Sequence, residues 1–396
     1  MRILAVWDDP AESELIRMYL GVDSAEVVLT TDSDEFLTLA DSGVAWDAIL
    51  LTTSYPSHDR AFEIFEHIRR RHVGVPIVAA CLPVDVYRLA TYLTSGLRSY
   101  LIRDANGDFM FLIHAVITGA VQQVEADRER LVAEKLRREI DSVRQLQESI
   151  IPHEIVCPKN YTIAARYESS QIRVIGGQPV TMAGGDYYDA FTLPDDSVIV
   201  LVGDASGHGM KACMSIMTMH TIIRMIRYDE FRDPAKFVEH VNRVLCGQQL
   251  VQNEGGFITL LYGVLNPISG EFRWASAGHP SPVLQRLTDG TFEVLGSDEA
   301  AGLPIGIIPD AEYETQSAQM PTGSRLMLYT DGIIEAFPAG GSRHEEFGLA
   351  GIQRTLTSCI GQGLGQTLQQ LFDDSQAFTA GQGRHDDTSV VLLERS

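Results

Sequence analysis

The chain has little positive charge, few cysteines and no long apolar run, and each shortage excludes a class of function. Lys and Arg number 31 against 53 Asp and Glu, so the formal net charge is −22. Such a chain repels phosphate backbones and anionic lipid, and no basic patch in the sequence offsets the charge. We therefore expect neither nucleic acid nor a membrane as a direct partner, which argues against a metal-dependent nuclease.

The five cysteines are scattered, without a CxxC pair, which predicts reduced thiols and no zinc site. No apolar run approaches the roughly 20 residues that span a bilayer. The opening "MRILAVW" is too short, and too soon followed by acids, to be a signal peptide. These absences predict a cytoplasmic protein.

A chain of 396 residues is too long for one ordinary core, so we expect two or more domains. Over residues 1–120, short β-rich runs such as "RILAVW", "EVVLTT", "WDAILLT" and "PIVAAC" alternate with helical segments. Strands that alternate with helices favour a parallel sheet covered on both faces. Residues 1–120 are therefore predicted to form a doubly wound, flavodoxin-like α/β domain.

Residues 121–152 are predicted to be a linker helix that ends at Pro152. Apolar residues recur at spacings of mostly three, four or seven, at Ile117, Val121, Val124, Leu131, Leu136, Ile140, Val143, Leu146 and Ile150. A narrow stripe between charged flanks is typical of a coiled coil, so we expect a parallel homodimer through this helix. The alternative is a helix that lies on its own domain.

The pattern changes over residues 153–396 to antiparallel β signals and four helical segments. "GDYYDAFTL" and "SVIVLVGD" flank the turn "PDD", and "GFITLLYGVL" and "EFRWASA" flank "NPISG", which predicts two hairpins. Sheets packed face to face, with helices outside, fit this order.

Acids stand at the ends of several of these strands. Counting back from the turn at 194–197 places Asp186 within about a residue of Asp204 on the partner strand. Asp331 ends the run "RLMLYTDG", and Asp386 and Asp387 precede "TSVVLLE". If those strands are antiparallel neighbours, four or five carboxylates gather at one edge. Oxygen ligands without His or Cys select Mg²⁺ or Mn²⁺; the alternative is a set of ordinary turn residues.

A series of motifs runs through this part of the chain, in the order "LQESIIP", "GGDYYDAF", "VGDASGHG", "FITLLYGVL", "WASAGHPSPVL", "GLPIGI", "LMLYTDGIIEA", "FGLAGI" and "RHDDTSVVLL". In these motifs and their order the chain resembles the bacterial PP2C-type (PPM) serine phosphatases of the SpoIIE and RsbU group. The resemblance implies an α-β-β-α sandwich with two Mn²⁺ or Mg²⁺ ions per domain, which activate water for hydrolysis of a phosphoserine or phosphothreonine.

The resemblance also implies the role of each acid. Asp204 would bridge both metals and the carbonyl oxygen of Ala205 would serve one of them. Asp331 and Asp386 would complete one metal, and Asp186 would hold the other directly or through water. Asp387 is a further possible ligand. The general acid stays unassigned, because the position after Asp204 and Ala205 is Ser206. For His208 and His279 a structural role is expected.

Residues 1–120 resemble a response-regulator receiver domain that has lost key groups. Asp8 and Asp9 stand where receivers keep their acidic pair, but Thr52 replaces the phosphoacceptor aspartate. Cys81 and Arg103 replace the family's switch hydroxyl residue and lysine. A threonine cannot substitute for a carboxylate nucleophile at its ordinary pKa. The domain is therefore predicted to be a pseudo-receiver that senses by binding a partner.

Together these features predict a metal-dependent protein serine/threonine phosphatase regulated by its first domain. The resemblance implies a substrate phosphoserine on a STAS-type anti-sigma factor antagonist in a partner-switching pathway. The alternative is a non-catalytic adaptor that binds a sigma-factor regulator through a phosphatase-like fold. Loss of the metal acids would mark such an adaptor, and all four are present.

Overall fold

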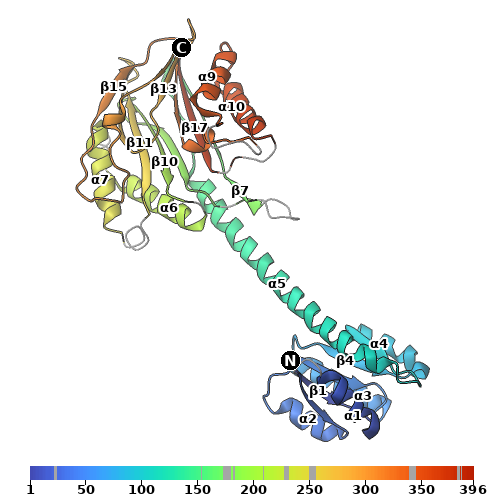
Figure 1. The fold of residues 1–396 in the computed structure, drawn as a ribbon. Coiled ribbons are helices and arrows are strands. Elements are labelled where there is room, and N and C mark those ends of the chain that lie inside the picture. The colour runs from blue at the N-terminus through green and yellow to red at the C-terminus, as the bar shows by residue number, and fades with distance from the viewer. Residues whose placement is uncertain are drawn as a thin grey trace. The chain divides into compact units, whose positions relative to one another are not determined.

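The computed structural model divides into two compact units, residues 1–136 and 137–396 (Figure 1). It describes residues 1–21, 25–152, 154–172, 180–181, 183–207, 209–226, 232–248, 256–338, 345–380, 384 and 386–396. The proposed boundaries at 120 and 152 fall inside or at the end of one long helix, α5 (Phe109–Ile150), which belongs to both units.

The first unit is a parallel five-stranded sheet in the order β2-β1-β3-β4-β5, the order of flavodoxin-like folds. Its strands are β1 (Arg2–Val6), β2 (Glu26–Thr30), β3 (Ala48–Thr52), β4 (Ile77–Cys81) and β5 (Ser99–Ile102). Its helices are α1 (Pro10–Leu20), α2 (Ser33–Asp41), α3 (His58–Arg71), a 3-10 turn at Pro83–Arg88, α4 (Leu89–Thr94) and the start of α5. The predicted alternation of strands and helices is confirmed.

Two cores cover the two faces of this sheet. Ile16 of α1 and Ile113 and Ile117 of α5 pack on one face, whereas residues of α2, α3 and α4 pack on the other. By length and composition α5 is able to span a membrane, which the sequence analysis did not anticipate. The first turns of α5 pack Ile113 and Ile117 against the sheet, and 28% of its most apolar stretch is buried.

The second unit contains two antiparallel five-stranded sheets, β15-β12-β11-β10-β9 and β14-β13-β16-β17-β6. Their strands are β6 (Tyr161–Glu168), β9 (Asp186–Thr192), β10 (Val198–Ala205), β11 (Ile258–Leu265), β12 (Glu271–Ala277), β13 (Val283–Arg286), β14 (Phe292–Val294), β15 (Gln316–Gln319), β16 (Ser324–Tyr329) and β17 (Thr388–Arg395). A separate pair joins β7 (Gln171–Ile172) to β8 (Val180–Thr181). Both predicted hairpins, β9–β10 and β11–β12, are present.

Helices cover the outer face of each sheet: α6 (Met210–Met225), α7 (Pro234–Cys246), α9 (Gly348–Ser358) and α10 (Leu364–Phe378). Two short 3-10 turns span Asp298–Ala300 (η4) and Asp331–Ile333 (η5). Side chains of α6 and α7 form one core with the first sheet, and side chains of α9 and α10 form another with the second. The unit is therefore the predicted α-β-β-α sandwich.

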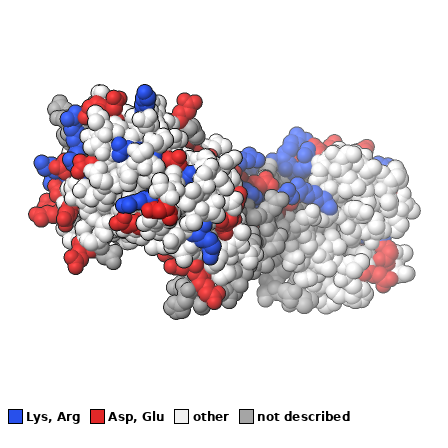
Figure 2. All heavy atoms as spheres, turned by 90° about the horizontal axis from the view of Figure 1, so that it is seen from above, with Lys and Arg blue, Asp and Glu red and all other residues white. Residues whose placement is uncertain are grey.

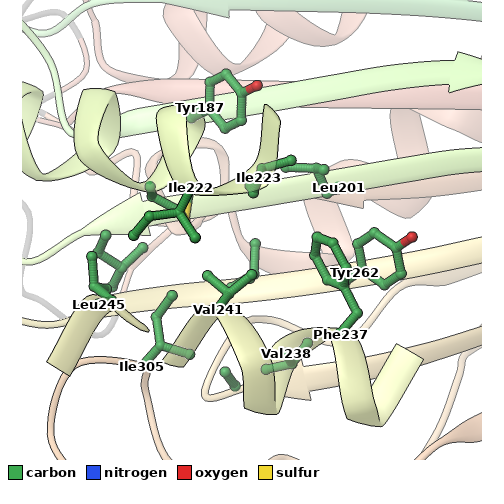
Figure 3. Packing of buried hydrophobic residues seen from close by; sticks show 14 of the residues in the cluster. Tyr187, Leu201, Ile222, Ile223, Phe237, Val238, Val241, Leu245, Tyr262 and Ile305 are labelled. Carbon is green, nitrogen blue, oxygen red and sulfur yellow. The ribbon is translucent and has the colours of Figure 1, made fainter. Parts of the chain in front are cut away.

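Strand β10 shows how the sequence pattern produces these layers. Val198, Val200 and Val202 enter the core between the sheets, whereas Ile199 and Leu201 face α6 and α7. Successive side chains of a strand point to opposite faces, so an apolar run of this kind must be covered on both. Figure 3 shows Leu201 among the residues of the helix-facing core, where the rings of Phe237 and Tyr262 stack 3.8 Å apart. This packing fixes β10, the strand that carries Asp204.

Candidate metal centre

The hairpin of β9 and β10 brings the first two candidate acids together. Asp204 is the direct cross-strand partner of Asp186, and the turn closes where Leu193 N–H donates to Ser197 O at 2.8 Å. The count back from the turn thus predicts the observed register. Asp186 is 1% exposed and Asp204 is mostly buried, so two carboxylates share one poorly solvated place.

Burial and mutual repulsion raise the pKa of both carboxyl groups. Desolvation is the largest cause for Asp186, followed by the charges of Asp204 and Asp387. Desolvation, with the charges of Asp331, Asp386 and Asp387, raises the pKa of Asp204 to about 8. An upward shift means that burial and negative neighbours outweigh any positive charge nearby. The electrostatic potential at this pair is therefore strongly negative.

The second sheet supplies the other two acids. Asp331 opens the turn that follows β16, and Asp386 lies two residues before β17, which is the antiparallel neighbour of β16. Burial, followed by the charge of Glu335, raises the pKa of Asp331. Gly332 must be glycine because an added Cβ would overlap the backbone oxygen of Asp387. The segments that carry Asp331 and Asp386 therefore lie in direct contact.

Two hydrogen-bonded links join the ends of the two sheets. Thr330 Oγ1 donates to Asp186 Oδ2 at 2.6 Å, and Ser389 N–H donates to Thr330 Oγ1 at 2.8 Å. Sequence reasoning missed Thr330, although its place directly before a candidate ligand is a usable signal. The hydroxyl fixes one oxygen of Asp186 and ties β9 to β16 and β17.

Asp387 is held differently from the other acids. Its Oδ1 accepts from Ser170 N–H at 2.7 Å and its Oδ2 accepts from Gly185 N–H at 2.6 Å. The side chain is 1% exposed. With both oxygens bonded to backbone, Asp387 positions the segment before Asp186.

The glycine pair before Asp186 is required by close packing. A Cβ on Gly184 would lie 2.5 Å from Asp387 Oδ2, and one on Gly185 would lie 2.8 Å from the carbonyl oxygen of Ala205. Real Cβ atoms do not approach so closely, so "GGD" is the sequence that lets these backbones meet. The contact also shows that the carbonyl of Ala205 lies beside the Asp186 segment.

The nearby hydroxyl and imidazole groups have structural contacts. Ser206 Oγ accepts from Phe257 N–H at 3.0 Å. Burial lowers the pKa of His279 to about 3, and its ring nitrogens bond Thr259 Oγ1 at 2.9 Å and Tyr329 O at 3.0 Å. A neutral, fully engaged imidazole cannot serve as a general acid at neutral pH. His208 lies outside the described residues.

The donor set of this edge consists of oxygen atoms: the carboxylates of Asp186, Asp204, Asp331 and Asp386 and the carbonyl of Ala205. Such hard donors, which are fully or partly buried and repel one another, fit Mg²⁺ or Mn²⁺. Within the described ranges, no three His, Cys, Asp or Glu side chains converge on a single point as they stand.

Asp8 of the acidic pair in the first unit is paired with Arg103, whereas Asp9 caps a helix. Arg103 is 7% exposed, and its guanidinium donates to Asp8 Oδ1 and to Glu12 Oε2, each at 2.7 Å. Asp9 Oδ1 accepts from the N–H groups of the first turn of α1, so it caps that helix. Thr52 is buried, and its hydroxyl has no hydrogen-bond partner among the described residues. Arg103 was noted from sequence, but its partner Glu12 was missed.

The fold and the buried acid cluster define a PP2C-type phosphatase domain in the second unit. The family model for stage II sporulation protein E (SpoIIE) matches residues 194–396, slightly more than half of the chain. The chain therefore belongs to the SpoIIE family, and the predicted membership among PP2C-type serine phosphatases is confirmed.

Two curated relatives show how much of the chain is shared. Protein IcfG of Synechocystis sp. (strain ATCC 27184 / PCC 6803 / Kazusa) is 25% identical over 289 residues, which cover 67% of this chain and 42% of that protein. Phosphoserine phosphatase RsbU of Bacillus subtilis is 24% identical over 321 residues, 79% of this chain and 87% of RsbU. The chain thus matches less than half the length of the first relative and most of the second.

Two solved structures share the fold. The SiaA-PP2C domain of Pseudomonas aeruginosa is 16% identical, with a TM-score of 0.53 over 67% of this chain and 99% of that one. The RsbU and RsbW domains of Rv1364c from Mycobacterium tuberculosis are 24% identical, with a TM-score of 0.50 over 62% of this chain and 63% of that one. At these identities the likeness shows the fold alone.

Proposed function

We propose that the protein is a metal-dependent protein serine/threonine phosphatase. The observation that carries the proposal is the set of four acids that two sheets deliver to one edge, where the pKa values of Asp186, Asp204 and Asp331 are all raised. Uncompensated buried carboxylates destabilise a fold. Their presence at this place is best explained by cation binding.

Asp204 would bridge two Mn²⁺ or Mg²⁺ ions, with the carbonyl of Ala205 on one of them. Asp331 and Asp386 would complete one ion, and Asp186 would serve the other directly or through water. When bound, such a pair supplies a water of lowered pKa and positive charge for the phosphoryl oxygens. The protein itself holds the ligands in place, through Thr330 on the Asp186 carboxylate and through Asp387 on the preceding backbone.

The substrate we propose is a phosphoserine on a STAS-type anti-sigma factor antagonist. Its support is family membership, together with the similarity to RsbU and to RsbP of Bacillus subtilis, both named phosphoserine phosphatases. In the view of Figure 2, Lys and Arg side chains are interspersed with Asp and Glu over the second unit, which is the larger of the two. Such a surface suits a protein substrate better than a nucleic acid.

We assign regulation to the first unit, acting as a pseudo-receiver over residues 1–120. The support is the buried Thr52 in place of an acidic nucleophile and the guanidinium of Arg103 at Asp8. Residues 121–152 would form the linker and 153–396 the phosphatase domain. The exposed Leu131 and Leu136 of α5 support a homodimer through this helix. We also propose that the protein is cytoplasmic.

The experiment is hydrolysis of a phosphoserine peptide and of p-nitrophenyl phosphate, with and without Mn²⁺. The same assay is run on Asp204→Asn, Asp331→Asn and, as a matched control, Asp310→Asn at an exposed acid of the same unit. Manganese-dependent turnover that is lost in the first two variants and kept in the third is expected. No turnover by the full-length protein would favour the non-catalytic adaptor.

A further inference from the structure

The last turn of α5 is hydrogen-bonded through Gln147 to the segment that leads into β9, the strand that carries Asp186. Helix α5 is described along its whole length, and Gln147 is its only polar residue that is buried, with 0% exposure. Ile150 and Ile151, which follow it, pack into the two cores on either side of the first sheet. The end of the helix is therefore a fixed part of the second unit.

The amide of Gln147 bonds backbone on both of its sides. Its Oε1 accepts from Gly184 N–H at 2.8 Å, and its Nε2 donates to Asp186 O at 3.2 Å. A buried amide group is costly unless its donor and its acceptor are both satisfied. Here both are satisfied by the two residues that lead into the candidate metal site.

The position of β9 in the sheet explains why such a contact is needed. β9 is the last strand in the order β15-β12-β11-β10-β9, so within the described ranges its outer backbone groups have no strand partner. Buried backbone N–H and C=O groups need hydrogen bonds. The Gln147 amide offers one acceptor and one donor to residues 184 and 186, as a peptide group of a neighbouring strand would. The Gln147 amide thus supplies the hydrogen bonds of a neighbouring strand at the start of β9, where Asp186 lies.

We propose that Gln147 is a positioning residue that sets the affinity of the Asp186 side of the centre for metal. This inference rests on the proposed function. The segment 184–186 is held on one side by Gln147 and on the other by Asp387, so the Asp186 carboxylate is aimed at Asp204 by contacts outside its own sheet. A shift of the last turn of α5 therefore moves a metal ligand.

The test substitutes Gln147 in the full-length chain and measures metal binding directly. Gln147→Met keeps the length and volume of the side chain but removes both hydrogen bonds. Gln145→Met makes the same change at an exposed position two residues earlier on the same helix. Each protein is stripped with EDTA, and Mn²⁺ is then titrated by calorimetry and by the electron paramagnetic resonance signal of free Mn²⁺.

Loss of a residue that orients a metal ligand typically weakens metal affinity by about 10- to 100-fold. We expect Gln147→Met to raise the dissociation constant for Mn²⁺ at least about tenfold, and Gln145→Met to leave it unchanged. With p-nitrophenyl phosphate at limiting Mn²⁺, kcat should fall while KM stays near wild type, and saturating Mn²⁺ should restore kcat. Hydrogen exchange at the Gly184 amide should become faster in Gln147→Met alone.

Wild-type Mn²⁺ affinity in a folded Gln147→Met protein would overturn the inference, and so would an equal loss in Gln145→Met. If Gln147→Met does not fold, Gln147→Asn replaces it, because that amide is one methylene too short to reach both backbone groups. Wild-type protein that neither binds Mn²⁺ nor hydrolyses phosphate would instead refute the proposed function. The two failures are thereby distinguishable.

Discussion

The acid cluster should make the metal-free protein less stable as pH rises, and removing one acid should stabilise it. The perturbation is Asp204→Asn, which keeps the shape of the side chain and removes the charge. Asp204 has an ordinary pKa of 3.8 and a pKa of about 8 in the folded protein. The folded state therefore binds more protons than the unfolded state between these values, and stability falls as pH increases from about 4 to about 8.

The magnitude follows from the shift. Each pKa unit corresponds to about 1.4 kcal/mol, so at pH 7 the penalty for keeping Asp204 in its site reaches about 4 kcal/mol. Asparagine avoids this penalty, but it alters the hydrogen bond that Asp204 shares with Asp186, which offsets about 1 kcal/mol. We expect metal-free Asp204→Asn to be more stable than wild type by about 2–4 kcal/mol at pH 7.

The assay is urea unfolding in EDTA at pH 5, 6, 7 and 8. Trp274 is 2% exposed between the two sheets and reports the second unit. The other two tryptophans, Trp7 and Trp46, lie in the first unit and are replaced by phenylalanine in every protein compared. Asp310→Asn, at an exposed acid, is the matched control. Added Mn²⁺ should stabilise wild type by mass action and should scarcely affect Asp204→Asn.

Two results would refute this reasoning. One is wild-type stability in EDTA that is constant from pH 5 to pH 8. The other is an Asp204→Asn protein that is less stable than wild type at pH 8. Either would mean that a positive group inside the protein already compensates the carboxylates, and a cation would then not be needed to explain the site.

Two further substitutions test the contacts around the acids. Gly332→Ala should destabilise the second unit by about 1–3 kcal/mol, or more, because its Cβ would overlap the backbone oxygen of Asp387; calorimetric unfolding measures this, and an unchanged transition would contradict the packing. Arg103→Met should destabilise the first unit by about 1–3 kcal/mol, because the partly exposed Asp8 and Glu12 lose their shared cation. Added Mg²⁺ should then stabilise the variant but not the wild-type unit; equal responses of the two would show that Arg103 does not replace a metal.

Much of the sandwich was predictable because turns and alternation are local signals. The turn at 194–197 fixes the hairpin register, so counting along β9 and β10 places Asp186 opposite Asp204. Alternating burial along β10 follows from its apolar run between two layers. These features depend on residues close in sequence, and a single sequence contains them.

Contacts between distant segments were less accessible. Asp386 and Asp387 are neighbours in sequence, yet Asp387 accepts from the backbone of Ser170 and Gly185, about 200 residues earlier. No local pattern shows which of these two carboxylates accepts from distant backbone groups. The pairing of Arg103 with Asp8 and Glu12 likewise joins the residue after β5 to two residues near the start of the sequence.

The linker helix contains a sequence signal for a buried contact that the sequence analysis did not use. Val143, Gln147 and Ile150 follow at spacings of four and three, so the glutamine interrupts an apolar stripe on the face that docks. A polar residue at such a position requires buried partners. Those partners are Gly184 and Asp186, and the sequence alone does not identify them because they lie at a sheet edge far along the chain.

Asp204 and Asp186 are held by different contacts, and this difference indicates which of the two a regulatory signal would move. Asp204 lies on β10, which pairs with β9 on one side and β11 on the other, so the sheet alone fixes its backbone. Asp186 begins an edge strand and depends on Gln147, Thr330 and Asp387 for its place. Hydrogen-bonded ladders open less readily than isolated side-chain contacts. A signal that loosens the centre should therefore act on Asp186 and leave Asp204 in place.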